Sequence, residues 1–293
     1  MNKIQYISIP FRSGCNREGA QFAPSKLCEL LGVDNMQTRQ LHLLSENQPL
    51  SDDQCQGVKN YETVLAMANR LRDMVAESIG EIHQVVTLGG DHSLALGSIA
   101  GVLQHEPNVG VIWFDAHTDI NTEASSPSGN AHGMPVAALM GLCQSALNEV
   151  APVRLKPQNI FWVGARDIDP GEEQILRQLG IYDHVYSADD VHRLGMKAVM
   201  ADIRSRMLAQ GITALHLSFD VDGMDPGIVA ATGTKVPNGL TQEDLDTFIQ
   251  SLSILPPMHT MDFVEYNPLM DDAQQTTGKW CKETLEKLCS VLW

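Results

Sequence analysis

Short apolar segments alternate with segments of helical periodicity along the chain, and this alternation restricts the fold more than any other feature of the sequence. We expect strands at residues 4–9, 84–88, 109–115, 160–164, 184–186, 213–219 and 260–265. We expect helices at residues 24–31, 61–79, 94–104, 134–142, 171–179, 196–209, 241–251 and 273–293. Strands that alternate with helices form a parallel sheet that is covered on both faces. The sequence therefore predicts an α/β protein with three layers, α/β/α, around a central, mainly parallel sheet.

Smaller features complete this prediction. Residues 37–44 fit neither pattern, and residues 51–56 are expected to form a loop. Thr241 is the expected N-cap of the helix that follows it, and Asp244 stands where a capping box needs an acidic residue. No linker rich in Pro, Gly or Ser divides the chain, and a hydrophobic content of 43% is enough for one large core. We therefore expect residues 1–293 to form a single domain.

Charge and cysteine content narrow the expected partners and compartment. The chain has 36 acidic and 20 basic residues and a formal net charge of −16. Such a surface repels nucleic acid and anionic membranes, so we expect neither as a partner. No apolar run reaches the ~20 residues that a membrane-spanning helix needs. The six cysteines include no CxxC pair, which is typical of a reducing compartment, and we expect a cytoplasmic protein.

Acidic and histidine side chains follow three of the expected strands at the points where these strands end. The residues are His92, Asp115, His117, Asp119, Asp220 and Asp222. On an extended chain, side chains two residues apart point the same way, so each group would face one side of its strand. Because ligands of parallel sheets bind beyond the carboxyl ends of the strands, we expect the six side chains to converge.

Carboxylates and imidazoles in this number predict a site for two divalent cations. Four ionised aspartates close together repel one another, and one divalent ion would leave a net charge of −2. Two ions would make the ligand set neutral, as in two-metal hydrolases where the ions lie ~3.5–4 Å apart. An oxygen-rich site without cysteine favours manganese by ligand softness. Affinity order alone would prefer later transition metals, so the cellular supply decides between them and manganese. We expect two divalent ions per chain, with manganese favoured by ligand type.

Seven motifs, three of which contain the six clustered residues, resemble those of the arginase branch of the ureohydrolases. These are binuclear manganese enzymes with an α/β fold of the arginase/deacetylase type. The motifs are GGDHS (89–93), DAHTDIN (115–121), SGNAHGMP (128–135), ARDIDPGE (165–172), SFDVDGMDP (218–226), ATGT (231–234) and VEYNP (264–268). GGDHS and DAHTD are shared by all ureohydrolases. The SGNAHG and RDIDPGE segments are arginase-like and carry the substrate assignment.

The resemblance implies a role for each site residue. One ion would be held by His92, Asp115, Asp119 and Asp220, and the other by His117, Asp115, Asp220 and Asp222. The substrate would be L-arginine, with its α-carboxylate at Asn121, Ser128 and Asn130, its α-ammonium at Asp169 and Glu172, and its guanidinium at Glu265 and near Thr234. Asp167 would orient its neighbours.

The implied reaction is hydrolysis of L-arginine to L-ornithine and urea by a hydroxide that bridges the metals. Glu265 would stabilise the tetrahedral intermediate, Asp119 would pass a proton to the departing amine, and His132 would relay protons to solvent. A homo-oligomer, trimer or hexamer, is expected from the resemblance alone.

Two other functions remain open at this point. A related ureohydrolase could act on agmatine or formimidoylglutamate, but agmatine has no α-carboxylate for Asn121, Ser128 and Asn130 to bind. A catalytically silent regulatory protein would be expected to lack a metal ligand or Glu265, and none is lost. The chain departs from the arginase pattern at Met134, where glutamine is usual, and at Ala230, where proline is common.

Overall fold

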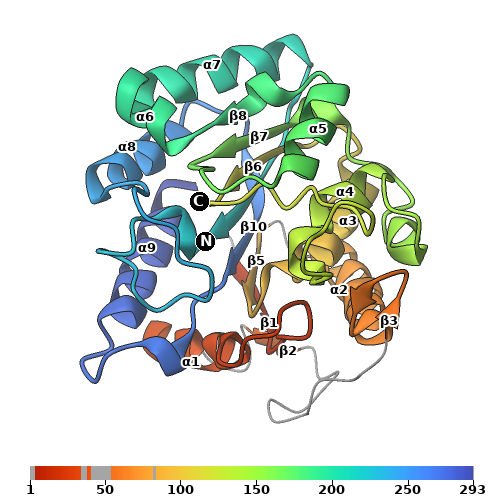
Figure 1. The fold of residues 1–293 in the computed structure, drawn as a ribbon. Coiled ribbons are helices and arrows are strands. Elements are labelled where there is room, and N and C mark those ends of the chain that lie inside the picture. Colours follow the sequence, from red (N-terminus) through yellow and green to blue (C-terminus); the bar gives the residue numbers. More distant parts are fainter. Residues whose placement is uncertain (1–3, 34–37, 41–53, 82–83, 293) are drawn as a thin grey trace.

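The computed structural model describes residues 4–33, 38–40, 54–81 and 84–292, and its centre is a parallel β-sheet (Figure 1). In the described residues the sheet has eight strands in the order β2-β1-β5-β10-β9-β6-β7-β8, and every strand pairing in it is parallel. The strands are β1 (Ile4–Ile9), β2 (Thr38–Gln40), β5 (Gln84–Gly89), β6 (Gly110–Phe114), β7 (Ile160–Val163), β8 (Val185–Tyr186), β9 (Leu215–Asp220) and β10 (Met258–Val264). The predicted α/β class is confirmed.

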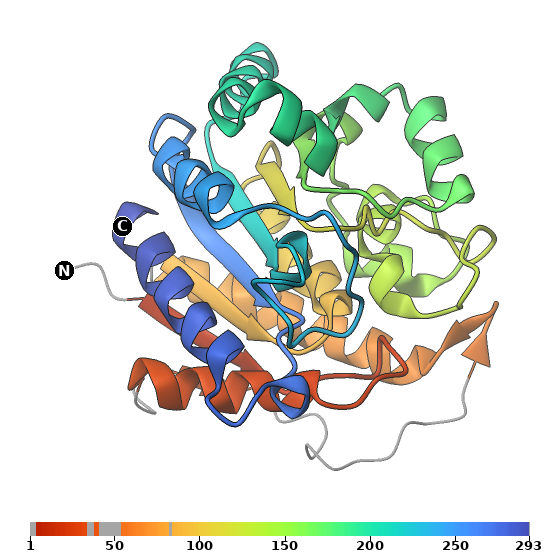
Figure 2. The ribbon, with the colours of Figure 1, turned by 60° about the vertical axis from the view of Figure 1, so that its left-hand side comes forward.

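Helices cover both faces of this sheet. One face carries α2 (Tyr61–Glu81), α3 (Ala95–His105), α4 (Pro135–Met140) and α5 (Pro170–Gln178). The other carries α1 (Ala23–Leu31), α6 (Ala188–Leu194), α7 (Met196–Ala209), α8 (Gln242–Leu252) and α9 (Thr276–Leu292). Figure 2 shows α9, near the end of the chain, packed beside α1, near its beginning. The two ends of the sequence therefore close the same layer.

Alternation of side chains along each strand produces two hydrophobic cores. On β6, Val111 and Trp113 belong to the core beneath α2 and α3, whereas Ile112 and Phe114 belong to the core on the opposite face. All four side chains are fully buried. A strand buried on both faces reads as a continuous apolar run, which is why residues 109–114 show no polar alternation.

The described elements lie close to those predicted, with differences at turns. Residues 51–56 were expected to be a loop; this is wrong for β3 (Gln54–Cys55), which pairs antiparallel with β4 (Val58–Lys59). Residues 37, 41–44 and 51–53 lie outside the described part, and 38–40 form β2. The hairpin is made by Gln56 and Gly57, which both have positive φ, as a two-residue turn requires.

Capping boxes mark the N-termini of two helices, α8 and α6. The predicted N-cap at Thr241 is confirmed, because its side chain accepts from the N–H of Asp244 in a capping box. Helix α6 was not predicted. It begins at a capping box, in which the Ser187 side chain accepts from the N–H of Asp190 and the Asp190 side chain accepts from the N–H of Ser187. The seven-residue helix is too short to show a clear apolar stripe.

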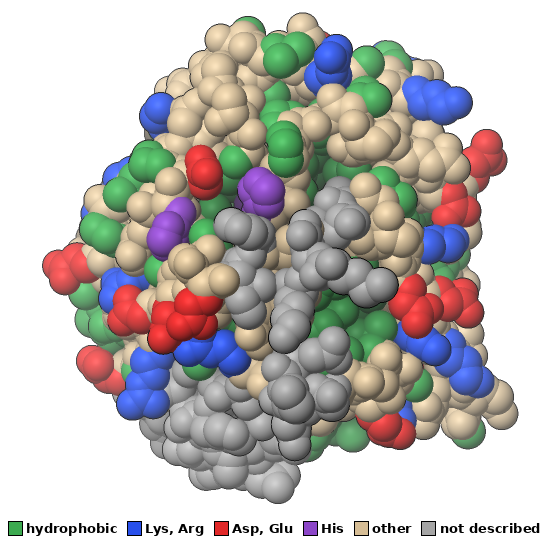
Figure 3. Space-filling view, turned by 180° about the vertical axis from the view of Figure 1, so that it is seen from behind, with side chains coloured by type: hydrophobic (Ala, Val, Ile, Leu, Met, Phe, Trp, Pro, Cys, Tyr) green, Lys and Arg blue, Asp and Glu red, His purple; other side chains and the backbone are tan. Residues whose placement is uncertain are grey.

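In the described residues, none of the helices combines the length and the apolar character that a bilayer crossing needs. On the face shown in Figure 3, acidic and basic side chains are interspersed and do not gather in one patch of either sign.

Aromatic stacking supports the strand that leads to Asp220. Phe219 is fully buried and lies between Phe114, at 4.4 Å between ring centroids, and Phe263, at 5.2 Å. We expect Phe219→Ala to lower the free energy of unfolding by about 3–5 kcal/mol, because it removes a large core side chain and leaves a cavity. Leu208→Ala, at a side chain 59% exposed, should change it by less than about 0.5 kcal/mol in the same denaturant titration. Equal effects of the two variants would contradict this account of the core.

Candidate active site

The carboxyl ends of β5, β9 and β6 carry the polar cluster, with β10 between β5 and β9, and the same local turn ends each of these three strands. After β5, Asp91 Oδ1 accepts from the N–H of Ser93 at 3.0 Å. After β6, Asp115 Oδ1 accepts from His117 N at 2.7 Å, and at the end of β9, Asp220 Oδ1 accepts from Asp222 N at 2.8 Å. Each is an aspartate that bonds the backbone two residues on and turns the chain sharply.

These turns correct the geometry expected from the sequence. Strand β6 ends at Phe114, so Asp115, His117 and Asp119 do not lie on an extended segment, and Asp222 lies in a short 3-10 helix, Val221–Gly223. Asp119 has a positive φ of 48°. The side chains therefore converge because the backbone turns around them, and alternation along a strand was the wrong reason for their proximity.

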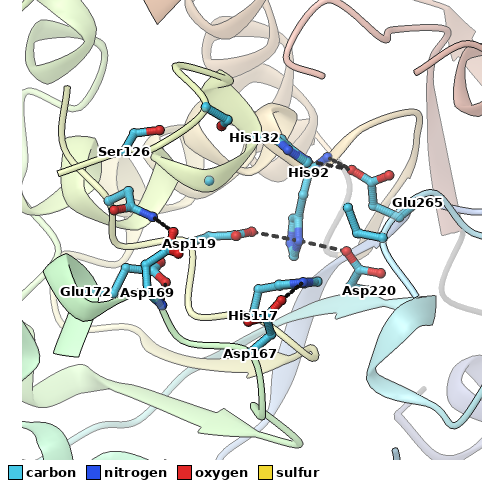
Figure 4. Close-up of a pocket in the computed structure, with 14 residues that line it drawn as sticks. His92, His117, Asp119, Ser126, His132, Asp167, Asp169, Glu172, Asp220 and Glu265 are labelled. Atoms are coloured by element: carbon cyan, nitrogen blue, oxygen red, sulfur yellow. Dashed lines mark hydrogen bonds and ion pairs between the residues drawn. The ribbon is translucent and has the colours of Figure 1, made fainter. Parts of the chain in front are cut away.

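All six predicted metal ligands lie in one cluster, in which five residues are buried and His117 is half-buried. His92 Nδ1 lies 2.9 Å from Asp115 Oδ2, 3.1 Å from Asp220 Oδ2 and 3.3 Å from Asp119 Oδ2. Figure 4 shows His92 between Asp119 and Asp220. Beside this group, His117 Nδ1 lies 3.2 Å from Asp115 Oδ1 and 3.3 Å from Asp222 Oδ2. Asp115 lies between the two histidines and belongs to both groups.

The cluster fits cations better than it fits internal hydrogen bonds. His92 Nδ1 is buried and faces three carboxylate oxygens, yet it makes no hydrogen bond of acceptable geometry. In each of two triads the potential ligand atoms lie within 4.8 Å of one another; the triads are His92, Asp115, Asp119 and Asp115, His117, Asp222. Convergent carboxylate oxygens and imidazole nitrogens are a donor set for divalent transition metals.

Burial and crowding shift the pKa values of these groups in directions that indicate uncompensated charge. Burial, together with Asp115, raises the pKa of Asp119 well above its ordinary value, and burial with Asp222 does the same for Asp220. For His92, burial lowers the pKa and the adjacent Asp115 raises it, with a net value of about 9. Without bound cations, the cluster therefore retains protons, because protons are then the only positive charges that can offset its carboxylates.

Residues that sequence analysis missed hold the ligands in place. The ring of His92 stacks on Trp113, with centroids 4.1 Å apart, and its Nε2 lies 2.8 Å from Ser218 Oγ. Trp113 Nε1 donates to Asp115 Oδ2 at 3.0 Å. Such contacts fix which imidazole nitrogen faces the cluster. Ser218 precedes Asp220 by two residues on β9, and this spacing was the available signal.

Arg166 ties the loop after β9 to the rest of the site. Its half-buried guanidinium donates to several backbone carbonyls, among them Asp222 O at 2.9 Å and Val236 O at 2.7 Å. In the loop so held, Thr234 Oγ1 donates to Asp222 Oδ2 at 2.8 Å. Thr234, predicted to lie near the substrate, therefore contacts a predicted metal ligand.

A pocket opens directly above the cluster. The residues that line it are His92, His117, Asp119, Asn121, Ser126, Ser128, His132, Gly133, Asp167, Asp169, Glu172, Asp220, Thr234 and Glu265. Most predicted substrate contacts are in this set; Asn130 lines an adjoining cavity that shares His132, Thr234 and Glu265 with the pocket. Ser126 and Gly133 were not predicted.

The predicted contacts for the α-amino group are already bonded to one another. Asn121 Nδ2 donates to Asp169 Oδ2 at 2.9 Å. Glu172 accepts from the backbone N–H of Ile120 at 3.1 Å and of Asp169 at 2.9 Å, the second as part of a capping box at the start of α5. Asp169 thus presents its carboxylate to the pocket from a fixed helix end.

Glu265 and His132 lie on the side of the pocket opposite Glu172 (Figure 4). Glu265 is buried, has a positive φ of 66°, and accepts from the backbone N–H of His92 at 2.8 Å. His132 Nδ1 lies 3.5 Å from the same carboxylate oxygen. Burial lowers the pKa of His132, but the neighbouring Glu265 outweighs it, and the pKa is raised. A non-glycine residue held in the left-handed region beside the cluster indicates a functional constraint.

Comparison with known proteins agrees with this geometry. The model of the arginase family matches residues 2–289. The chain is 37% identical to an arginase of Entamoeba histolytica, over 99% of this chain and 98% of the relative, and 35% identical to an arginase of Bacillus subtilis, over 97% of each. The chain belongs to the arginase family. The resemblance stated from the motifs is thereby confirmed.

Solved structures of the family share the fold. The crystal structure of the Entamoeba histolytica arginase in complex with L-ornithine superposes with a TM-score of 0.87 at 35% identity, covering 98% of this chain and 97% of that one. The arginase of Bacillus caldovelox gives a TM-score of 0.87 at 32% identity, covering 98% of each chain. The predicted arginase-type fold is confirmed.

The pKa directions predict how pH affects the metal-free protein. A carboxyl group with a raised folded pKa loses its stabilising effect as pH rises from about 4 through that pKa, and a histidine with a raised pKa loses it above about 6.5. Asp119, Asp220 and Asp222 belong to the first class and His92 and His117 to the second. The cluster should therefore destabilise the metal-free fold more at pH 8 than at pH 5.

Thermal denaturation with and without Mn²⁺ checks this expectation. Saturating Mn²⁺ should raise Tm by about 5–10 °C at pH 8, and by clearly less at pH 5, where protons compete for the same oxygens. An equal gain at both pH values would show that the cluster does not titrate in this way.

Proposed function

We propose that this chain is a dinuclear metal hydrolase that converts L-arginine to L-ornithine and urea. The observation that carries the proposal is the convergence of four aspartates and two histidines beneath one pocket. Glu265 and His132 line the same pocket, on the side opposite Glu172. The arginase relatives and the L-ornithine complex of one of them support the same reaction. Residues 1–293 would act as one catalytic domain.

The six clustered residues would hold two ions, for which we propose manganese. His92, Asp115, Asp119 and Asp220 would hold one, and His117, Asp115, Asp220 and Asp222 the other. Two bound divalent ions would lower the pKa of water enough to supply a nucleophile at neutral pH. Oxygen donors outnumber nitrogen donors, and no cysteine lines the pocket among the described residues, which favours manganese.

The residues of the pocket wall would orient the substrate. Glu265 would pair with the guanidinium and direct its carbon toward the cluster, because the carboxylate is fixed by the N–H of His92. Asp169, held by Asn121, would meet the α-ammonium. Glu172 would add to this contact through lone pairs that its two backbone donors leave free. Asn121, Ser128 and Asn130 would meet the α-carboxylate.

Two groups would move protons. Asp119 lies at the pocket floor, where its carboxyl group would pass a proton to the departing amine of ornithine. His132 is partly exposed at the pocket wall, and its imidazole would exchange protons between Glu265 and solvent. We also propose a cytoplasmic homo-oligomer, trimer or hexamer; the six free cysteines are consistent with a reducing compartment.

Urea release tests the substrate. With Mn²⁺ supplied, we expect turnover of L-arginine to exceed that of agmatine by at least about a hundredfold in kcat/KM, because agmatine lacks the carboxylate that three pocket residues would bind. Faster urea release from agmatine would instead identify a different ureohydrolase.

A metal count tests the ligand set. Asp220→Ala should reduce bound manganese from two ions to one or none per chain and abolish urea release, since Asp220 would contact both ions. Asp183→Ala, at an exposed carboxylate paired with Arg206, should retain both ions and full activity. Two ions in Asp220→Ala by elemental analysis would contradict the assignment.

A further inference from the structure

The β3–β4 hairpin, which immediately precedes α2 (Figure 1), packs directly against the loop that carries Ser128 and Asn130. The backbone N–H of Lys59 donates to Gly129 O at 2.9 Å. A Cβ atom on Gly129 would lie 2.3 Å from Gly57 O, and Gly129 has a φ of +70°. Only glycine therefore fits between the two segments. This close packing fixes the position of Lys59, the last residue of the hairpin.

That side chain is Lys59, and it contacts a residue of the proposed substrate site. Lys59 Nζ lies 3.4 Å from Asn130 Oδ1. An amide group can present either its oxygen or its NH₂ to a ligand, and an ammonium can only donate. With its oxygen turned to the ammonium, Asn130 keeps its NH₂ free to donate to an anion. Lys59 thus sets Asn130 in the orientation that a carboxylate requires.

The charge of the pocket makes such a cation necessary. Six carboxylates line the pocket: Asp119, Asp167, Asp169, Glu172, Asp220 and Glu265. No Lys or Arg is among the described residues that line it. Even where bound cations neutralise the floor, Asp167, Asp169 and Glu172 would repel an incoming carboxylate. Lys59 brings a positive charge to Asn130, which lines the adjoining cavity.

We propose that Lys59 is a specificity-determining residue, which selects substrates with an α-carboxylate over decarboxylated diamines and guanidines by orienting Asn130 and offsetting the acidic wall. This inference rests on the proposed function, because it assigns one end of the amino-acid substrate to this side of the pocket. It assigns a role in substrate recognition to the hairpin, of which residues 54–56 were expected from the sequence to be loop.

The test compares Lys59→Met with Lys59→Arg, which keeps the charge. A matched control is Lys156→Met, because Lys156 Nζ donates to Asn108 Oδ1 at 2.7 Å on the exposed surface, away from the pocket. Binding of L-ornithine and of 1,4-diaminobutane to the manganese-loaded protein is measured by calorimetry, and KM and kcat for L-arginine are measured by urea release.

We expect Lys59→Met to weaken ornithine binding and to raise KM for arginine, each by about five- to tenfold, with kcat within about twofold of the wild type. Diaminobutane binding should be unchanged, because that ligand has no carboxylate. Lys59→Arg should restore most of the loss, and Lys156→Met should match the wild type.

Unchanged ornithine affinity in Lys59→Met would overturn the proposal. So would equal losses for ornithine and diaminobutane, which would indicate a structural role for Lys59. A rise in KM in Arg17→Met but not in Lys59→Met would place the carboxylate in the adjoining cavity, which Arg17 lines, and would also overturn it. The binding comparison needs no turnover, so a wild-type protein that releases no urea from arginine contradicts the proposed function and leaves the test of Lys59 valid.

Discussion

Repulsion among four buried aspartates is the constraint on which the rest of this structure depends. Asp115, Asp119, Asp220 and Asp222 are each less than 10% exposed and share two histidines. Carboxylates in this arrangement are unfavourable unless protons or cations compensate them. The surrounding fold therefore has to supply enough stability to hold the cluster together, and it does so with two hydrophobic cores on opposite faces of one sheet.

The groups that hold the cluster are mostly neutral. Ser218, Trp113 and Thr234 bond to its imidazole and carboxylates, and the half-buried Arg166 bonds to backbone carbonyls of the loop. Neutral donors fix the orientation of a ligand without removing its capacity to bind a cation. Glu265 is held in the same way: it accepts from a neutral backbone N–H, and its negative charge is left to pair with a guanidinium.

Much of the sheet could be read from the sequence, since strands buried on both faces are continuous apolar runs. The segment Gly110–Phe114 is such a run and lies within the predicted strand 109–115. The predicted bounds 4–9 also agree with β1, although Gln5 and Ser8 interrupt its apolar residues. The hairpin at Gln54–Lys59 escaped prediction because its strands are two residues long and its turn depends on a positive φ at Gln56. Helix α6 escaped for a similar reason: a capping box signalled it, and periodicity did not.

The sequence by itself determined which chemical groups are present and at which strand ends they stand, because motif spacing and apolar runs are local properties of the chain. It also predicted the family that the comparisons show. Only the tertiary structure decided how the groups meet. The Ser218 contact of His92 and the approach of Lys59 to Asn130 join residues through packing of segments distant in the chain. Such contacts depend on how strands are ordered in the sheet, and one-dimensional periodicity contains no information about that order.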